Sequence, residues 1–105
     1  MKLYEARYIY QLLAGAHLTG MTAEQKYKVI DLMVEVKKPC MEFEEFIKDT
    51  KEKVSDEKEL TEILNKEASK TIELKFEKLG EVFDKLIEAN DWTVNDISLM
   101  KELVK

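Results

Sequence analysis

The sequence is poor in residues that interrupt helices and in residues that carry most enzyme chemistry. Its 105 residues include three Gly, one Pro, one Cys and one His. So little Gly and Pro leaves few positions at which a helix has to end. The single cysteine, Cys40, excludes an internal disulfide and favours a reducing cytoplasm.

Neither an export signal nor a membrane span is expected from the hydrophobic pattern. Lys2, an apolar stretch and small residues at 14–16 imitate a signal peptide, but Glu5 and Arg7 interrupt what would be its apolar segment. No uninterrupted apolar run approaches the ~18 residues that a membrane-spanning helix needs. We therefore expect a cytoplasmic protein without membrane contact.

An excess of basic residues is also missing. The formal net charge is −5, with four acidic and six basic residues in 1–40 but 18 acidic and 11 basic residues in 41–105. Phosphate binding needs a basic surface, so we expect no nucleic-acid partner. A basic protein surface, or a second copy of the chain, fits this charge distribution better.

What the sequence does contain suits a helical domain. Hydrophobic residues make up 45% of the chain, enough for a core, and charged residues of both signs make up 37%. Such a composition is typical of helices with solvated outer faces. We expect one domain over residues 1–105, the common size for a single core.

The first expected helix, residues 3–16, is apolar on more than one side. One set of its residues follows helical spacing: Leu3, Ala6, Ile9 and Leu13. Other apolar side chains point elsewhere, namely Tyr4, Tyr8, Tyr10 and Leu12. A helix of this kind is central in its own fold or covered by a second subunit. Because tyrosine is enriched at interfaces, the second set is the candidate interface, with plain core packing as the alternative.

A second apolar stripe runs from about residue 23 to 54, and its members are three or four residues apart throughout. They are Val29, Met33, Val36, Cys40, Phe43, Ile47, Thr50 and Val54. Thr22 and Gln25 form a capping box at its start. Pro39 lies inside the stripe, where proline costs ~3 kcal/mol in a helix. Because the stripe keeps its phase, we predict one kinked helix rather than two separate ones.

A third stripe predicts another long helix, from about residue 56 to 89. Its members are Leu60, Leu64, Ala68, Ile72, Phe76, Leu79, Phe83 and Leu86. Gly80 lies within it at a cost of about 1 kcal/mol relative to Ala. Residues 72–76 alternate apolar and polar side chains, which is a strand pattern. Because Glu, Lys, Leu and Ala surround them, we favour helix here and keep the strand as the alternative.

The predicted fold class is all-α. A short polar turn near residues 55–56 would join the two long helices into a long antiparallel hairpin. The first helix and a last short helix would pack against it. Thr93 and Asp96 can cap that last helix, and its expected inner face consists of Val94, Ile97, Met100 and Val104.

Residues for catalysis or metal binding are few and scattered. His17 has no Cys or Ser at a suggestive spacing, and Cys40 lies on an apolar stripe as a core residue would. The acidic residues 42, 44 and 45 point in different directions on a helix, and the Glu-x-x-His motifs of di-iron bundles are missing. We expect no enzyme activity, no cofactor and no metal.

The layout resembles small helical proteins encoded in bacteriophage and prophage genomes. The resemblance is carried by residues 27–33 opening a long helix, the acidic turn, and residues 76–83 leading to the short tail 94–104. It implies a bacterial or phage cytoplasm and no catalytic residue. Gly20 and Pro39 depart from the pattern.

From these observations we predict a non-enzymatic interaction or assembly protein that associates with itself as a homo-oligomer. The alternative is a small acidic regulator or inhibitor that occupies a basic surface on a host protein.

Overall fold

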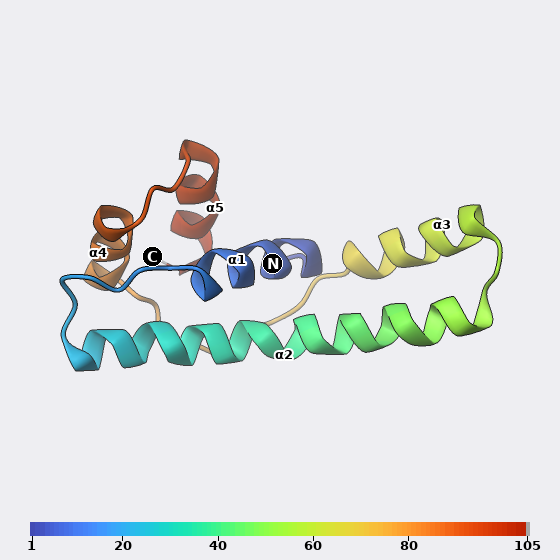
Figure 1. The fold of residues 1–105 in the computed structure, drawn as a ribbon, viewed down its shortest axis with the longest axis horizontal. Helices are drawn as coiled ribbons and strands as arrows, with labels where there is room; N and C mark the ends of the chain where they lie inside the picture. Colours follow the sequence, from blue (N-terminus) through green and yellow to red (C-terminus); the bar gives the residue numbers. More distant parts are fainter. Residues whose placement is uncertain (105) are drawn as a thin grey trace.

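A computed structural model describes residues 1–104 and the side chains of residues 1–102. This part of the chain forms five helices (Figure 1): α1 (Leu3–Ala14), α2 (Ala23–Lys53), α3 (Glu57–Ala68), α4 (Glu81–Ala89) and α5 (Val94–Val104). Among the described residues no strand is formed, and the one β-bridge joins Lys2 to Thr71. The all-α class predicted from the sequence is confirmed.

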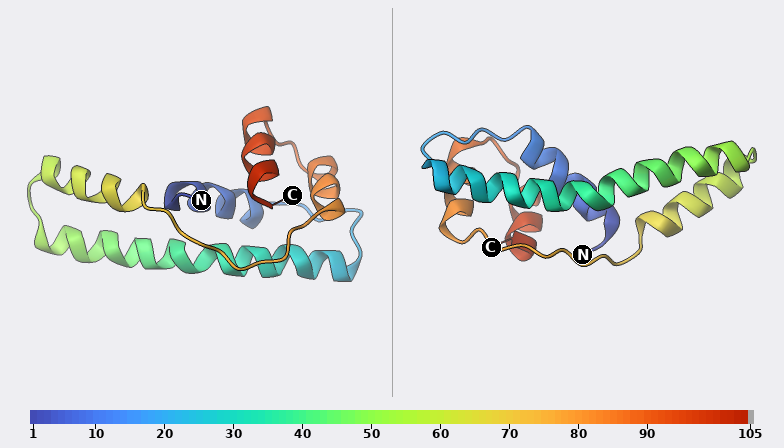
Figure 2. Two further views of the ribbon diagram at one scale, coloured as in Figure 1. Left: turned by 180° about the vertical axis from the view of Figure 1, so that it is seen from behind. Right: turned by 90° about the horizontal axis from the view of Figure 1, so that it is seen from below.

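The 31-residue α2 is the longest element and sets the elongated shape of the molecule, 49 × 24 × 21 Å. α1 packs against its middle and α3 runs back along its C-terminal part, while α4 and α5 lie at the other end (Figures 1 and 2). Thr22 and Gln25 form the predicted capping box, each accepting a backbone N–H bond from the other.

Pro39 lies inside α2, as predicted. Val36, Cys40 and Phe43, on either side of it, are all buried. This burial continues in phase through the proline, and it offsets the ~3 kcal/mol that proline costs inside a helix.

The second long helix predicted over residues 56–89 is wrong. α3 ends at Ala68, α4 begins at Glu81, and residues 69–80 between them are not helical. We call residues 69–80 the connecting segment. Since the returning helix has 12 residues instead of about thirty, the long antiparallel hairpin is not confirmed.

The connecting segment follows the alternating pattern that we had ranked second. Ile72, Leu74 and Phe76 are half-buried against the core, and the residues between them are exposed. An extended chain places these three side chains on one face, whereas a helix would turn Leu74 away from the other two. Figure 2 shows the connecting segment crossing one face of α2 as an extended, non-helical chain.

Backbone bonds from the N-terminus hold the start of the connecting segment. The Leu3 N–H donates to the Lys70 carbonyl at 3.0 Å, and the Ile72 N–H donates to the Met1 carbonyl at 2.8 Å. These partners satisfy backbone groups that neither a helix nor a sheet satisfies here.

Gly80 ends the connecting segment and takes the N-cap position of α4, so the prediction of a helical Gly80 is wrong. Its φ of +56° is in the left-handed region that glycine adopts without a Cβ penalty. The turn allows Leu79 before it and Phe83 after it to enter the core, and both are buried as predicted.

The core lies at the end of the molecule where α1, α4 and α5 meet the N-terminal half of α2. Its largest fully buried side chains are Phe83, Leu3, Ile9, Leu32, Leu86, Met100 and Val36. All of the residues of α3 are described, and none is buried. α3 and the C-terminal part of α2 therefore form an arm beside the core.

The last helix has the predicted cap. The Asp96 N–H donates to Thr93 Oγ1 at 3.2 Å, and the Thr93 N–H donates to Asp96 Oδ2 at 3.0 Å. Met100 is buried and Ile97 half-buried, but Val94 is 80% exposed, so its predicted place on the inner face is wrong. Val94 is the first residue of the helix and projects beyond the core. The Val104 side chain lies outside the described ones.

Phe83 and Phe76 should differ in their effect on stability. We expect Phe83→Ala to lower the free energy of unfolding by ~3–5 kcal/mol because Phe83 is 1% exposed. Phe76→Ala should cost about 1–1.5 kcal/mol, because its ring is only half-buried. Urea unfolding of both variants measures this, and equal losses would contradict the extended connecting segment.

Candidate protein-interaction site

The inner face of α1 anchors the helix to its own chain. Leu3, Ala6, Ile9 and Leu13 are all at most 4% exposed, as the helical spacing predicted. These four side chains are therefore not available to a partner. Among the large apolar side chains of α1, only the candidate interface residues could contact one.

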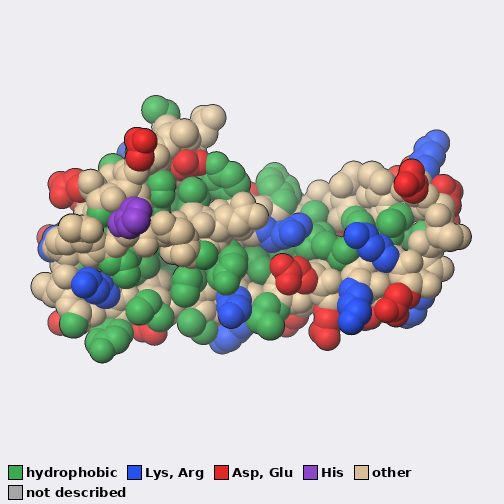
Figure 3. All heavy atoms as spheres, viewed as in Figure 1, with side chains coloured by type: hydrophobic (Ala, Val, Ile, Leu, Met, Phe, Trp, Pro, Cys, Tyr) green, Lys and Arg blue, Asp and Glu red, His purple; other side chains and the backbone are tan. Residues whose placement is uncertain are grey.

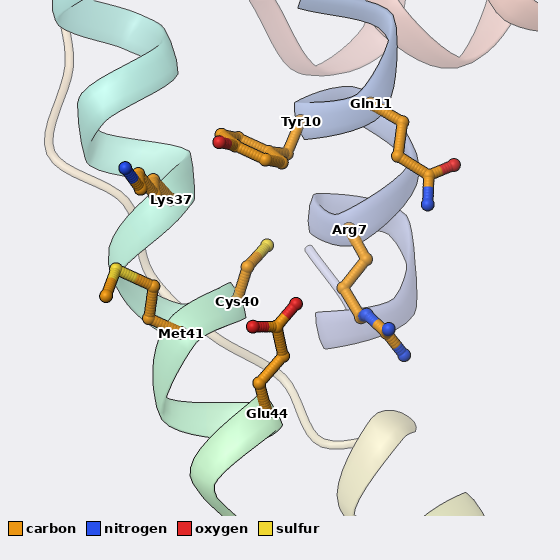
Figure 4. A pocket seen from close by; sticks show the side chains of 7 residues that line it. All are labelled: Arg7, Tyr10, Gln11, Lys37, Cys40, Met41 and Glu44. Carbon is orange, nitrogen blue, oxygen red and sulfur yellow. The ribbon is translucent and has the colours of Figure 1, made fainter. Parts of the chain in front are cut away.

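The structure does not bring all four candidate interface residues to one surface. Tyr4 and Tyr8, one turn apart, are 55% and 43% exposed. Tyr10 and Leu12 are half-buried and pack against the core. Tyr10 points from α1 toward α2 (Figure 4). Of the four, Tyr4 and Tyr8 are the more accessible, and their contact with a partner stays a prediction.

Tyr8 already has a partner within the chain. Its hydroxyl donates to Oδ1 of Asp96, the buried carboxylate that also caps α5. This bond raises the pKa of Tyr8, and burial and the Asp96 charge add to the effect. The same bond, helped by the bonds from Thr93, lowers the pKa of Asp96 against the opposing effect of burial. The pair therefore ties α1 to α5 as a neutral phenol and a charged carboxylate.

A shallow hollow of about 170 Å³ lies between α1 and α2. Figure 4 shows Cys40 between the two helices, with Tyr10 and Lys37 on one side and Glu44 and Arg7 on the other. Burial raises the pKa of the Cys40 thiol, with a smaller contribution from Glu44 against the lowering effect of Arg7. A protonated thiol is a poor nucleophile, and the hollow is smaller than the ~300 Å³ of typical ligand pockets.

A second surface, which our sequence analysis missed, is the outer face of α2. Its large apolar side chains are Tyr27, Ile30, Val34 and Met41, which are 65%, 41%, 46% and 57% exposed. We call these four residues the outer stripe. At 3.6 residues per turn they lie on the face of α2 opposite the buried Val29 and Val36. Figure 3 shows hydrophobic side chains gathered over the N-terminal part of α2.

The outer stripe ends abruptly at Met41. The next residues at the same helical positions are Glu45, Lys48 and Glu52, all exposed. Charged side chains of both signs spread over that end of the molecule (Figure 3). The apolar exposure is thus confined to a length of about 21 Å along α2.

A sequence signal for the outer stripe exists in the spacing of residues 27, 30, 34 and 41. Steps of three, four and seven residues mark one face of a helix. We overlooked it because Val29 to Val54 gives a longer stripe on the same helix, and one apolar face sufficed to explain the fold.

Other classes of site find no support in the described residues. Within them no group of three or more His, Cys, Asp or Glu side chains could hold a metal ion. Nor does any described helix combine the length and apolar character needed to cross a membrane. Comparisons with protein-family models, curated proteins and solved structures found no match to this chain. The resemblance to phage-encoded helical proteins therefore stays a prediction.

The bond between Tyr8 and Asp96 should make stability depend on pH at both extremes. The contribution of Asp96 is complete above its ordinary pKa of 3.8 and is lost as pH falls through its lower folded pKa. The contribution of Tyr8 is complete below its ordinary pKa of 10.0 and is lost as pH rises through its higher folded pKa. Tyr8→Phe should destabilise the protein at neutral pH and weaken both dependences.

Denaturant unfolding over a pH series tests this expectation. Tyr4→Phe is the matched control, because it removes a hydroxyl from the same exposed face without touching Asp96. Identical pH profiles for wild type and Tyr8→Phe would show that the bond contributes nothing.

Proposed function

We propose that this protein acts by binding other protein chains, including its own copies, and not by catalysis. The observation that carries the proposal is the outer stripe, four large apolar side chains left in water on the helix that organises the fold. Single exposed apolar residues are ordinary on protein surfaces, but several of them along one helix face, here interrupted only at Lys37, mark an interaction site.

The spacing of the outer stripe supports a helical partner. Residues 27, 30, 34 and 41 occupy the two positions of a seven-residue repeat that face the partner in a coiled coil. The fold does not need these side chains, because Val29, Leu32 and Val36 already bury the opposite face of α2. Tyr4 and Tyr8 on α1 are a second candidate contact with a partner.

The chemistry around the hollow supports a role without catalysis. The cysteine in its lining is the buried Cys40, and burial raises the pKa of this thiol and favours its protonated form. Catalysis by a thiol requires the opposite shift, with a base or a positive environment that favours the thiolate. We therefore place the function in the exposed apolar surface.

Self-association should be visible for the wild-type protein in solution. Sedimentation equilibrium across micromolar concentrations should give a mass above the 12.3 kDa of one chain. Because apolar contacts dominate the proposed interface, the association should survive about 0.5 M salt, at which exposed charge pairs are screened. A mass of one chain at every concentration would remove self-association from the proposal.

A further inference from the structure

We infer that the outer stripe of α2 pairs with the same stripe of a second copy, antiparallel, about a two-fold axis beside Val34. This inference rests on the proposed self-association and adds the surface, the partner and the orientation. Helices that pair in this way make an isologous contact, in which one patch serves both subunits.

The stripe is complementary to itself only in the antiparallel direction. Tyr27 and Met41 lie seven residues before and after Val34, so each would face the other across the axis. Ile30 would face Lys37 of the second copy, which is the stripe position between Val34 and Met41. The aliphatic stem of lysine can cover an apolar neighbour while its ammonium group stays in water.

A parallel pair would place Lys37 directly against Lys37 of the second copy, between the Val34 and Met41 contacts. Like charges facing each other in a partly desolvated contact destabilise it. The antiparallel pair places these two charges on opposite sides of the axis, about 9 Å apart along the seam, so the position of Lys37 decides the direction.

Charges at the edges of the stripe agree with the same register. Asp31 precedes Val34 by three residues and Lys38 follows it by four, both on one edge of the stripe. In the antiparallel pair Asp31 of each copy meets Lys38 of the other, which gives two ion pairs. Lys38 is 64% exposed and now bonds Glu35 on its own helix at 2.6 Å, so its ammonium group can be shared with the second copy.

The other edge and the ends of the seam set limits to the affinity. On the opposite edge, Lys26 lies eight residues before Val34 and Glu44 lies ten residues after it. These two side chains also have opposite charges. At each end, however, Glu24 would approach Glu45 of the second copy. Because the seam is only about 21 Å long, we expect a dissociation constant in the micromolar range.

Seen from below, α2 lies in front of the other helices, with the connecting segment along one side of it (Figure 2). Asp31 and Lys38 line hollows between α2 and that segment, and Lys37 and Met41 line the hollow against α1, so these two elements border the outer stripe. The connecting segment and the core helices pack on the remaining sides of α2: Ile72 and Leu74 lie beside Pro39, and Phe76 beside Leu32. Val34, at the proposed axis, is 46% exposed. A second helix would therefore approach α2 between the connecting segment and α1.

The decisive variant is Val34→Glu, which would bring two carboxylates together at the axis. We expect it to remain a monomer at concentrations up to about 200 µM, at least tenfold above the wild-type dissociation constant. Its helix content by circular dichroism should match the wild type because Val34 is exposed on the face of α2 opposite the core. Val94→Glu, at an exposed apolar position on α5 outside both candidate surfaces, is the control and should still form dimers.

Charge reversal tests the register. Asp31→Lys and Lys38→Asp should each raise the dissociation constant about 5- to 20-fold, because each replaces two attractions with two repulsions. Combining both substitutions in one chain should restore wild-type affinity. If the double variant is weaker than either single variant, the antiparallel register is wrong.

Cross-linking tests the direction independently of affinity. In a Cys40→Ser background, a mixture of Tyr27→Cys and Met41→Cys chains should oxidise to a mixed disulfide faster than either chain links to itself. Faster self-linking of each variant would show a parallel pair.

The possible failures separate the inference from the proposed function. A wild type that is monomeric at all concentrations would overturn both self-association and the α2 pairing. Dimers that persist in Val34→Glu but disappear in Tyr4→Glu would leave self-association standing and move the interface to α1. That result would overturn the inference about α2.

Discussion

Burial of the inner face of α2 is the interaction on which the rest of the structure depends. Val29, Val36 and Phe43 keep one helical phase across Pro39, so a single continuous face is available to both α1 and the elements that follow. If the helix broke at the proline, the residues before and after it would face different directions. The cost of an internal proline is acceptable because packing on both sides of it stabilises the continuous helix.

The connecting segment shows how a distant partner can override local preference. Residues 72–76 fit both a helical stripe and a strand pattern, and their Glu, Lys, Leu and Ala neighbours led us to favour helix. The choice is made by the first residues of the chain, since the Met1 carbonyl and the Leu3 N–H bond backbone groups at Ile72 and Lys70. An extended segment can then bury alternate side chains against α2 without belonging to a sheet.

Sequence reasoning succeeded where the signals were local and failed where they were not. The caps at Thr22 and Thr93 and the continuity through Pro39 follow from spacings within a few residues, and the structure has all three. The extended course of residues 69–80 depends on backbone bonds to residues about seventy positions earlier in the chain. The spacing of neighbouring residues carries no information about such distant bonds. The outer stripe was present in the spacing but was masked by a longer stripe on the same helix.

α2 divides into two parts that use their outer face differently. Up to Met41 the helix carries apolar side chains on both faces, one buried by its own chain and one exposed. Beyond Met41 the outer positions become Glu45, Lys48 and Glu52, while the inner face continues under α3. A helix needs one apolar face to join a core, and a second one adds nothing to the stability of an isolated chain. The second face is restricted to the part of α2 whose inner side is buried by the core, and such a supported position suits the docking surface that we propose.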